Sequence, residues 1–296
     1  MPALAPPAYA VPRVEFRDGQ ARLLPARPVP PEMTRPRYSI VSPGTERRHL
    51  ADSVIAPRLA GYMSLSGDAE RGWALAPVPH GAAWRPTPET ELAAPPGTGL
   101  AAAALARFAQ MALLGLDRLP PGTDLRQAVV VVGSGPVALG CVLELYRRGC
   151  TAITVLTSRA DAPIGHAPGA RCVTALPPGG APLVIDATGM PQRAIALLAP
   201  GAVLGLLGTP TADEVVPLAA VHRSFWTVVG MHELARLGHH SYPAAYRTAL
   251  TWLRSLPATL LESWCRIVPG EHAEDAYRAL AGHRLPGPVT IFDWGT

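Results

Sequence analysis

A glycine-rich segment in the middle of the chain carries the clearest chemical signal. Residues 128–138 read AVVVVGSGPVA, the pattern G-x-G-x-x-A placed directly after an apolar, strand-like run. The first glycine permits a tight turn and the second lets the main chain approach a diphosphate, while Ala138 and Gly140 keep the following helix close to the strand. The first N–H groups of that helix face the phosphates. The segment predicts a dinucleotide-binding loop made by Gly133, Ser134, Gly135, Pro136 and Val137; the alternative is a glycine turn that serves packing alone.

The residues after the next expected strand bear on which dinucleotide fits. NAD enzymes place an Asp or Glu there to bind the ribose 2′-hydroxyl. This sequence has Thr157, Ser158 and Arg159 instead. Hydroxyl groups and a guanidinium can hold a 2′-phosphate, which a carboxylate would repel. We therefore expect NADP(H), although Asp161 is near enough in the sequence to keep NAD open, and Arg159 can equally be a solvated surface residue.

Two further segments end expected strands at the same edge of the sheet. They read DATG at residues 186–189 and GTP at residues 208–210. Open α/β sheets bind ligands at the carboxyl ends of their strands. We expect Thr188, Gly189, Gly208 and Thr209 to lie near the ribose or the nicotinamide; the plainer interpretation is two strand-ending turns.

These loops need a sheet to position them, and the sequence supplies one from residue 127 onward. Short apolar runs alternate with amphipathic segments, which predicts an α/β domain with a parallel sheet covered on both faces. The expected strands are residues 128–132, 152–156, 183–186, 202–207 and 226–230, and the expected helices are residues 137–148, 191–198 and 243–256.

The first hundred residues have a different texture. They are rich in Pro and Gly with short β-like runs at 11–16, 21–24 and 38–41, which indicates a small irregular β domain. A helix is expected at 100–116, closed by Pro120-Pro121-Gly122. After Pro257 the pattern predicts a strand at 264–268, a helix at 271–281 and a strand at 289–293, and these elements can return to the first domain.

Composition narrows the class of protein. The chain has 296 residues, 48% hydrophobic and 16% charged, with 26 basic and 22 acidic residues, and every basic residue is Arg. The Arg residues are scattered rather than clustered, so we expect no nucleic-acid partner. No apolar run reaches the roughly 20 residues of a membrane span, and the N-terminus is a poor signal peptide; we therefore expect a cytoplasmic protein with no membrane association. The four cysteines form no C-x-x-C pair.

Together these segments resemble the medium-chain dehydrogenase/reductase superfamily. The resemblance rests on residues 131–140, 186–189, 201–208 and 222–230, and on Ser42-Pro43-Gly44-Thr45-Glu46, which is similar to the C-G-T-D/E stretch of zinc-dependent alcohol dehydrogenases. It implies a Rossmann doubly wound parallel sheet at 116–257 and a GroES-like, mostly β substrate domain from 1–115 and 258–296. It also implies a small-molecule substrate bound in a cleft between the domains, and a homodimer paired along the edge strand at 225–229.

The departures from this family concern zinc. Pro43 stands where zinc-dependent members have Cys, the G-H-E segment corresponds to Gly61-Tyr62-Met63, and the four-cysteine lobe is missing. A catalytic zinc needs such thiolate and imidazole ligands. We therefore expect no metal and a zinc-independent member with a shortened substrate domain.

Hydride transfer without zinc needs another group to stabilise the charge that develops on the substrate. The candidate donors are His80, expected in a polar turn rather than on an apolar face, and Tyr62, Tyr38, Thr45 and Ser42, with Glu46 to orient one of them or to hold an Arg. Adjacent His239 and His240 are expected to face solvent rather than to chelate a metal.

Three functions remain open at this stage. The first is an NADPH-dependent reductase of an activated C=C or C=N bond in a small biosynthetic intermediate, with or without subsequent ring closure. The second is a zinc-free NADP-dependent alcohol dehydrogenase or ketoreductase. The third is a family member that binds nucleotide without catalysis.

Overall fold

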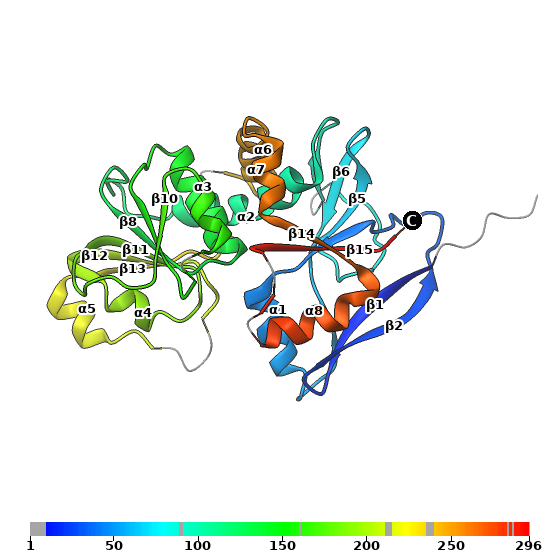
Figure 1. Cartoon of the computed structure of the whole chain (residues 1–296), viewed down its shortest axis with the longest axis horizontal. Helices are drawn as coiled ribbons and strands as arrows, with labels where there is room; N and C mark the ends of the chain where they lie inside the picture. The colour runs from blue at the N-terminus through cyan, green and yellow to red at the C-terminus, as the bar shows by residue number, and fades with distance from the viewer. Residues whose placement is uncertain are drawn as a thin grey trace, which may run out of the picture. The chain divides into compact units, whose positions relative to one another are not determined.

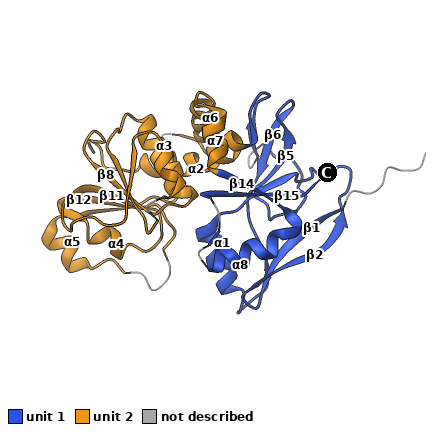
Figure 2. Ribbon diagram, in the orientation of Figure 1, with its two compact units in different colours: residues 1–100, 265–296 blue, residues 101–264 orange. Residues whose placement is uncertain are grey.

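The computed structural model describes residues 10–88, 91–159, 161–210, 215–234, 240–282, 284–285 and 287–295. The chain forms two compact units, one from residues 1–100 and 265–296 and the other from residues 101–264 (Figures 1 and 2). The sequence placed these divisions at 115 and 257 instead.

The first boundary differs because helix α2 (Leu100–Leu116) belongs almost entirely to the second unit, whereas the sequence-based boundary at residue 115 placed it in the first. It is apolar on all sides and is buried from Ala101 onward, as expected of a helix enclosed by other elements. The hydroxyl of Tyr246, in the second unit, donates to the carbonyl of Ala103 at 3.0 Å. At the other boundary the indole of Trp264 donates to the carbonyl of Pro163 at 3.0 Å. Both contacts tie the boundary segments to the second unit.

The second unit contains a six-stranded sheet in the order β10-β9-β8-β11-β12-β13, with every neighbouring pair parallel. Its strands are β8 (Val129–Val132), β9 (Ile153–Leu156), β10 (Ala170–Val173), β11 (Ala181–Asp186), β12 (Leu198–Leu206) and β13 (Thr227–Gly230). The strand order reverses between β8 and β11, which is the arrangement of a doubly wound Rossmann sheet. The predicted α/β fold is therefore confirmed.

The second unit also contains helices. They are α2, α3 (Pro136–Arg147), α4 (Gln192–Ile195), α5 (Leu218–Ser224), α6 (Tyr242–Leu253) and α7 (Ala258–Ser263), with a 3₁₀ turn at Pro163–His166. Of these, α3, α4 and α5 contact the sheet. Strand β8 consists of four valines that are between 0% and 6% exposed, as expected of a strand covered on both faces.

The first unit is mostly β-structure. One sheet has the order β14-β15-β3-β5-β6-β7 and a smaller one has the order β2-β1-β4. The strands are β1 (Ala10–Arg17), β2 (Gln20–Pro28), β3 (Tyr38–Ile40), β4 (Arg58–Leu59), β5 (Ser64–Asp68), β6 (Gly72–Ala76), β7 (Leu92–Ala94), β14 (Cys265–Pro269) and β15 (Val289–Asp293). Strand β15 pairs with both β14 and β3, so both ends of the chain build one sheet.

Local sequence explains the first hairpin of this unit. Strands β1 and β2 pair through Arg17 and Gln20, which leaves Asp18-Gly19 as a two-residue loop. Both loop residues have positive φ, at 54° and 73°, which is the conformation that Asp-Gly hairpin turns favour. Helices α1 (Pro43–Asp52) and α8 (Ala273–Ala281), with a 3₁₀ turn at Gly270–His272, complete the unit.

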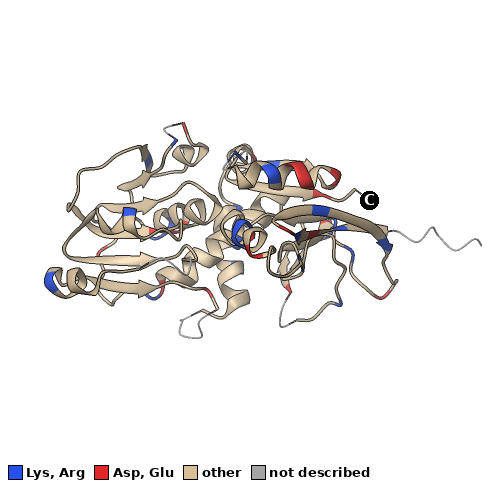
Figure 3. Cartoon of the chain, turned by 90° about the horizontal axis from the view of Figure 1, so that it is seen from below, with Lys and Arg blue, Asp and Glu red and all other residues tan. Residues whose placement is uncertain are grey.

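Charged residues are dispersed over the ribbon. Figure 3 shows basic and acidic positions interspersed on helices, strands and loops, rather than gathered on one element. Within the described ranges, every helix is too short or too polar to cross a lipid bilayer.

Candidate functional site

The glycine loop lies at the point where the strand order reverses. Gly133 follows β8 with φ at 114°, and its N–H donates to the carbonyl of Leu156 at 2.9 Å. A Cβ at position 133 would lie 2.9 Å from the side chain of Thr188, so this turn requires glycine. The loop thereby brings the ends of β8, β9 and β11 together.

Helix α3 begins at the next glycine. Gly135 is its N-cap residue and has extended backbone, which any residue can adopt. A Cβ at this position would meet nothing within 4 Å, so the main chain faces open space and is accessible to a ligand. Pro136 occupies the first helical position, where its missing N–H costs no helical hydrogen bond, and Val137 follows it. These features fit a diphosphate at the start of the helix.

The end of β9 contacts this loop directly. The hydroxyl of Thr157 donates to Oγ of Ser134 at 2.9 Å, and the Arg159 guanidinium donates to the same oxygen at 3.3 Å. The main-chain N–H of Arg159 donates to Oγ1 of Thr157 at 3.2 Å. Ser158 and Arg159 are exposed, and within the described part of the chain no carboxylate pairs with Arg159. Hydroxyl groups and one exposed cation therefore lie at the end of β9, the place where Rossmann sheets bind a ribose 2′-substituent.

The loops after β11 and β12 pack against each other. Asp186 is fully buried, and its carboxylate accepts bonds from the N–H and hydroxyl of Thr188 at 2.9 and 2.5 Å and from the N–H of Gly189 at 3.1 Å. A Cβ on Gly208 would lie 2.4 Å from the nitrogen of Gly189, and Thr209 is exposed beside them. Asp186 thus shapes the loop that carries Thr188 and Gly189.

Two of the predicted donors in the first unit form a pair. The hydroxyl of Tyr62 donates to Oγ of Ser42 at 2.8 Å. Ser42 is the N-cap residue of α1, and its side chain makes no capping bond. Its main-chain N–H instead donates to Oε1 of Glu46 at 2.7 Å. Because Ser42 is buried while Tyr62 is partly exposed, the phenol is the accessible member of the pair.

A buried cluster lies behind this pair. Glu46 is fully buried, and its Oε2 accepts from the Tyr277 hydroxyl at 2.5 Å and lies 3.0 Å from Nε2 of His80. Burial raises the pKa of Tyr277 well above its ordinary value, and the neighbouring Glu46 raises it further. Both carboxylate oxygens of Glu46 are therefore occupied by groups of the first unit, which fixes the start of α1.

The position of His80 corrects the sequence-based expectation. His80 lies in a turn, as expected, but it is fully buried rather than accessible, with the Phe292 ring centroid 5.3 Å from its own. Its Nδ1 lies 2.7 Å from Oγ of Ser39, and Glu46 is on its other side. The Ser-His-Glu connectivity resembles that of hydrolase triads, but a fully buried Ser39 cannot meet a substrate. Both ring nitrogens have partners, which explains how the histidine is buried.

The remaining candidates of the first unit, Tyr38 and Thr45, have other surroundings than the buried cluster. Tyr38 is 8% exposed and packs edge-on against Trp73, with ring centroids 5.8 Å apart. Thr45 is partly exposed in the first turn of α1. Where the structure is described, no group of three or more His, Cys, Asp or Glu side chains gathers as a metal site would require.

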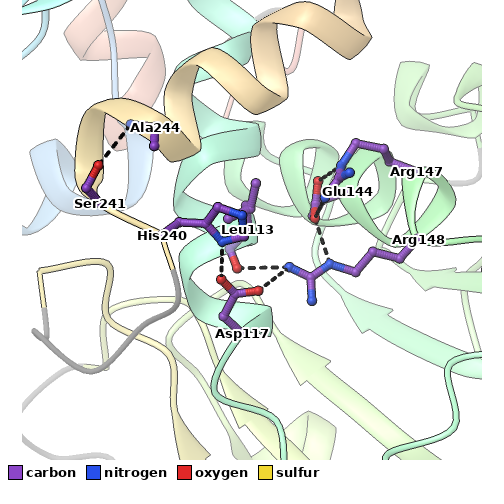
Figure 4. Close-up of polar contacts among 8 residues, drawn as sticks. All are labelled: Leu113, Asp117, Glu144, Arg147, Arg148, His240, Ser241 and Ala244. Atoms are coloured by element: carbon purple, nitrogen blue, oxygen red, sulfur yellow. Dashed lines mark hydrogen bonds and ion pairs between the residues drawn. The ribbon is translucent and has the colours of Figure 1, made fainter.

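A charged cluster in the second unit joins three helices (Figure 4). Arg148 donates to Asp117 at 2.7 Å and to Glu144 at 2.6 Å, and Arg147 donates to Glu144 at 2.6 Å. Nδ1 of His240 lies 2.8 Å from Asp117. His240 was expected to face solvent, but its side chain is 37% exposed and is held by Asp117. His239 lies outside the described residues.

Sequence reasoning missed several groups in both units. Ser39 and Tyr277 join the buried cluster from segments distant in the sequence, so no local motif marks them. In the second unit, Arg107 and Glu233 form a nearly buried ion pair at 2.5 and 2.8 Å, and exposed His232 stands next to it at the end of β13. The place of His232 directly after a strand was the signal that could have identified it.

Several solved structures have a similar fold. Galactitol-1-phosphate dehydrogenase of Escherichia coli has a TM-score of 0.72 at 16% identity, over 95% of this chain and 99% of that one. The YhdH oxidoreductase of Salmonella enterica, solved in complex with NADP, has a TM-score of 0.68 at 15% identity, over 96% and 99%. Alcohol dehydrogenase TADH of Thermus sp. ATN1 has a TM-score of 0.72 at 15% identity, over 95% and 99%. The chain thus shares the fold of these dehydrogenases and oxidoreductases, with the Rossmann sheet and the mostly β domain that the resemblance predicted.

No protein-family model matches the sequence, and no curated protein matches it.

Proposed function

We propose that the chain is an NADP(H)-dependent oxidoreductase acting on a small molecule. The observation that carries this proposal is the loop of Gly133 to Gly135, which meets Thr157 and Arg159 at the reversal point of a doubly wound sheet. Residues 133–137 would hold the diphosphate, and Ser134, Thr157, Ser158 and Arg159 would hold a 2′-phosphate. A structural neighbour solved in complex with NADP supports the same choice.

The cofactor would supply a hydride, and the first unit holds groups suited to manage the accompanying proton. We propose that Tyr62 is the proton donor and that Ser42 stabilises the phenolate left behind by turning its hydroxyl toward it. Glu46 positions Ser42 through its main-chain N–H. The buried His80 and the packed Tyr38 become second choices as donors, and Thr45 stays a candidate for orienting the substrate.

For the reaction we propose reduction of an activated C=C or C=N bond in a small biosynthetic intermediate, with or without later ring closure. The donor set supports this choice, because Pro43 and Tyr62 stand where zinc ligands are expected. A phenol suffices to protonate the carbanion or nitrogen anion that hydride addition leaves. Reduction of a ketone is the second candidate, since a phenol can also protonate an alkoxide.

Two measurements test this function. NADPH fluorescence titrated with the full chain should show binding at least tenfold tighter than that of NADH, as expected for a charge-assisted phosphate contact. Deuterated NADPH offered with a panel of enones, cyclic imines and ketones should place deuterium on a carbon of the former C=C bond or on the carbon of the former C=N bond. Equal affinities for NADH and NADPH would contradict the choice of NADP(H). Deuterium on a carbinol carbon would support the ketoreductase. Tight NADPH binding without turnover of any substrate would support the non-catalytic alternative.

We further propose a cytoplasmic homodimer paired along β13. This strand pairs only with β12 among the described strands, and Phe225 and Leu218 beside it are 80% and 79% exposed. Replacing Phe225 with Glu should convert a dimer to a monomer in sedimentation measurements, and a wild-type monomer would contradict the proposal. Cell fractionation tests the compartment.

A further inference from the structure

The ring of His80 lies against the segment that carries Tyr62. A Cβ at Gly61 would lie 2.4 Å from Nε2 of His80, so the imidazole packs on the main chain directly before Tyr62. Gly61 has φ at 79°, a conformation that favours glycine, and the missing side chain leaves room for the ring. The main-chain N–H of His80 also donates to the carbonyl of Ala60 at 2.9 Å. His80 thereby holds the two residues that precede Tyr62.

The same ring reaches the segment that carries Ser42. Nε2 of His80 lies 3.0 Å from Oε2 of Glu46, and Oε1 of this carboxylate accepts from the Ser42 N–H at 2.7 Å. The Ser42 hydroxyl in turn accepts from the Tyr62 phenol at 2.8 Å. One imidazole therefore contacts the main chain before Tyr62 and, through one carboxylate, the main chain of Ser42.

The partners of His80 determine which ring nitrogen donates. A carboxylate only accepts hydrogen bonds, so Nε2 carries the proton that faces Glu46. Nδ1 of the neutral ring then accepts from the Ser39 hydroxyl, 2.7 Å away, and the Ser39 oxygen accepts from the Trp294 indole at 2.9 Å. With this tautomer, every polar group in this buried chain of contacts has a partner, as buried polar groups require.

The turn that carries His80 is itself held in place. The buried hydroxyl of Ser64, in β5, donates to the carbonyls of Val78 and Pro79 at 3.3 and 3.0 Å. His80 is fully buried, and Phe292 packs edge-on against its ring. Main chain, ring packing and two hydrogen bonds together restrict the imidazole to one orientation.

We propose that His80 is a positioning residue for the proton donor: its Nε2–H orients Glu46 and its ring supports Gly61, which together keep the hydroxyls of Ser42 and Tyr62 at hydrogen-bonding distance. This inference rests on the proposed function, because it presupposes that Tyr62 donates the proton. It gives His80 a part in the reaction in which no proton leaves its ring and no substrate touches it. Small displacements of a reacting group cost much of the rate, so a buried side chain of this kind affects kcat.

Two amide replacements of His80 separate its two hydrogen bonds. The amide nitrogen of Gln can take the place of Nε2 and donate to Glu46, whereas that of Asn can take the place of Nδ1 and meets Ser39 instead. His80→Asn should lower kcat by about tenfold or more, and His80→Gln should stay within about threefold of the wild type. KM and NADPH affinity should change little in either variant. A proton-donating or proton-relaying histidine predicts equal losses in both, because neither amide transfers a proton.

Nuclear magnetic resonance follows the same pair without turnover. Tyrosine labelled with ¹³C at Cζ gives a signal for Tyr62, which is identified by its loss in Tyr62→Phe. This signal should shift in His80→Asn and keep its wild-type position in His80→Gln. In the wild-type chain, ¹⁵N spectra should show a slowly exchanging Nε2–H, because His80 is the one fully buried histidine among the described residues. The ¹⁵N measurement needs no variant that folds.

The outcomes distinguish this inference from the function on which it rests. Equal kcat values for His80→Gln and His80→Asn in an active enzyme would overturn the inference, and so would a His80 ring with its proton on Nδ1 and none on Nε2. The proposed function would stand in both cases. If the wild-type chain neither binds NADPH nor turns over any substrate of the panel, the proposed function itself fails and the inference falls with it.

Discussion

Gly140 of helix α3 lies directly against the main chain of Phe108 in helix α2. A Cβ at position 140 would lie 2.4 Å from the carbonyl carbon and oxygen of Phe108 and 2.8 Å from the nitrogen of Ala109. The sequence had suggested that this glycine brings α3 close to β8. In the structure it instead lets two helices pack closely, and through α2 it connects α3 to the interior of the second unit.

Replacing Gly140 with Ala should therefore destabilise the second unit. The added methyl group meets main-chain atoms that cannot rotate away, and such overpacking costs about 1–3 kcal/mol of unfolding free energy. Guanidinium denaturation followed by fluorescence measures the change. Gly180→Ala is the control, since a Cβ there meets nothing within 4 Å; equal stability of the two variants would contradict the close packing.

Arg159→Ala should reduce the preference for NADPH over NADH. Removing a guanidinium from a phosphate contact weakens NADPH binding by about tenfold or more, because hydrogen bonds to charged groups contribute roughly 1.5–3 kcal/mol. NADH binding should stay unchanged, since NADH carries no 2′-phosphate. Arg171→Ala, on the neighbouring edge strand, serves as the comparison; an equal loss in both variants would point to general charge rather than a specific contact.

Tyr62→Phe should slow turnover of whichever substrate of the panel reacts best. Loss of a positioned proton donor lowers kcat by about 10²-fold or more, whereas NADPH affinity stays as in the wild type. Tyr38→Phe, which changes a packed tyrosine, should retain most of the rate. Stopped-flow measurement of NADPH oxidation gives both values, and a Tyr62→Phe enzyme with full kcat would remove this residue from the mechanism.

Because of Asp117, the unfolding free energy of the second unit should decrease at acidic pH. Burial opposes ionisation of this carboxyl, but its hydrogen bonds with His240 and Arg148 outweigh burial and hold its pKa below the ordinary 3.8. A lowered pKa stabilises the fold above the unfolded-state pKa, and this stabilisation is lost as the pH falls through the folded-state pKa. Asp117→Asn should therefore cost about 1–3 kcal/mol at neutral pH. The gap from wild type should narrow below pH 4 in denaturation curves; a gap independent of pH would contradict the assignment.

Tyr277 should set an alkaline limit to stability. Burial and the adjacent Glu46 raise its pKa well above the ordinary value of 10. The unfolded chain therefore loses this proton first, and the folded state loses stability as the pH rises above 10. Tyr277→Phe removes that dependence, although it also leaves one Glu46 oxygen with one partner fewer. Thermal unfolding between pH 8 and 11 compares the two proteins, and parallel curves would show that Tyr277 already ionises in the folded state.

Local signals were sufficient to predict much of the second unit. The four valines of β8, the two glycines after them and the polar tip of β9 are close in sequence and in space, so pattern and position agree. Strand β10 was missed because it is a short edge strand that includes the exposed Arg171, and so lacks a continuous apolar run.

The first unit was harder to predict because its contacts are long-range. His80 is buried by Ser39 and Glu46, which are 41 and 34 residues away, and by Phe292 near the other end of the chain. Its flanking Pro and Gly suggested only a turn. Helix α1 was not predicted, although Ser42-Pro43 is a typical helix start.

The sheet in which β3 pairs with β15 has a consequence for biosynthesis. Strand β3 is flanked by β5 on one side and by β15 on the other, so during translation one of its edges stays open until residues 289–293 leave the ribosome. The second unit is contiguous in sequence and can fold before that moment. The nascent protein can therefore fold the unit that carries the glycine loop first and complete the first unit last. Until then the open edge of β3 is an aggregation hazard.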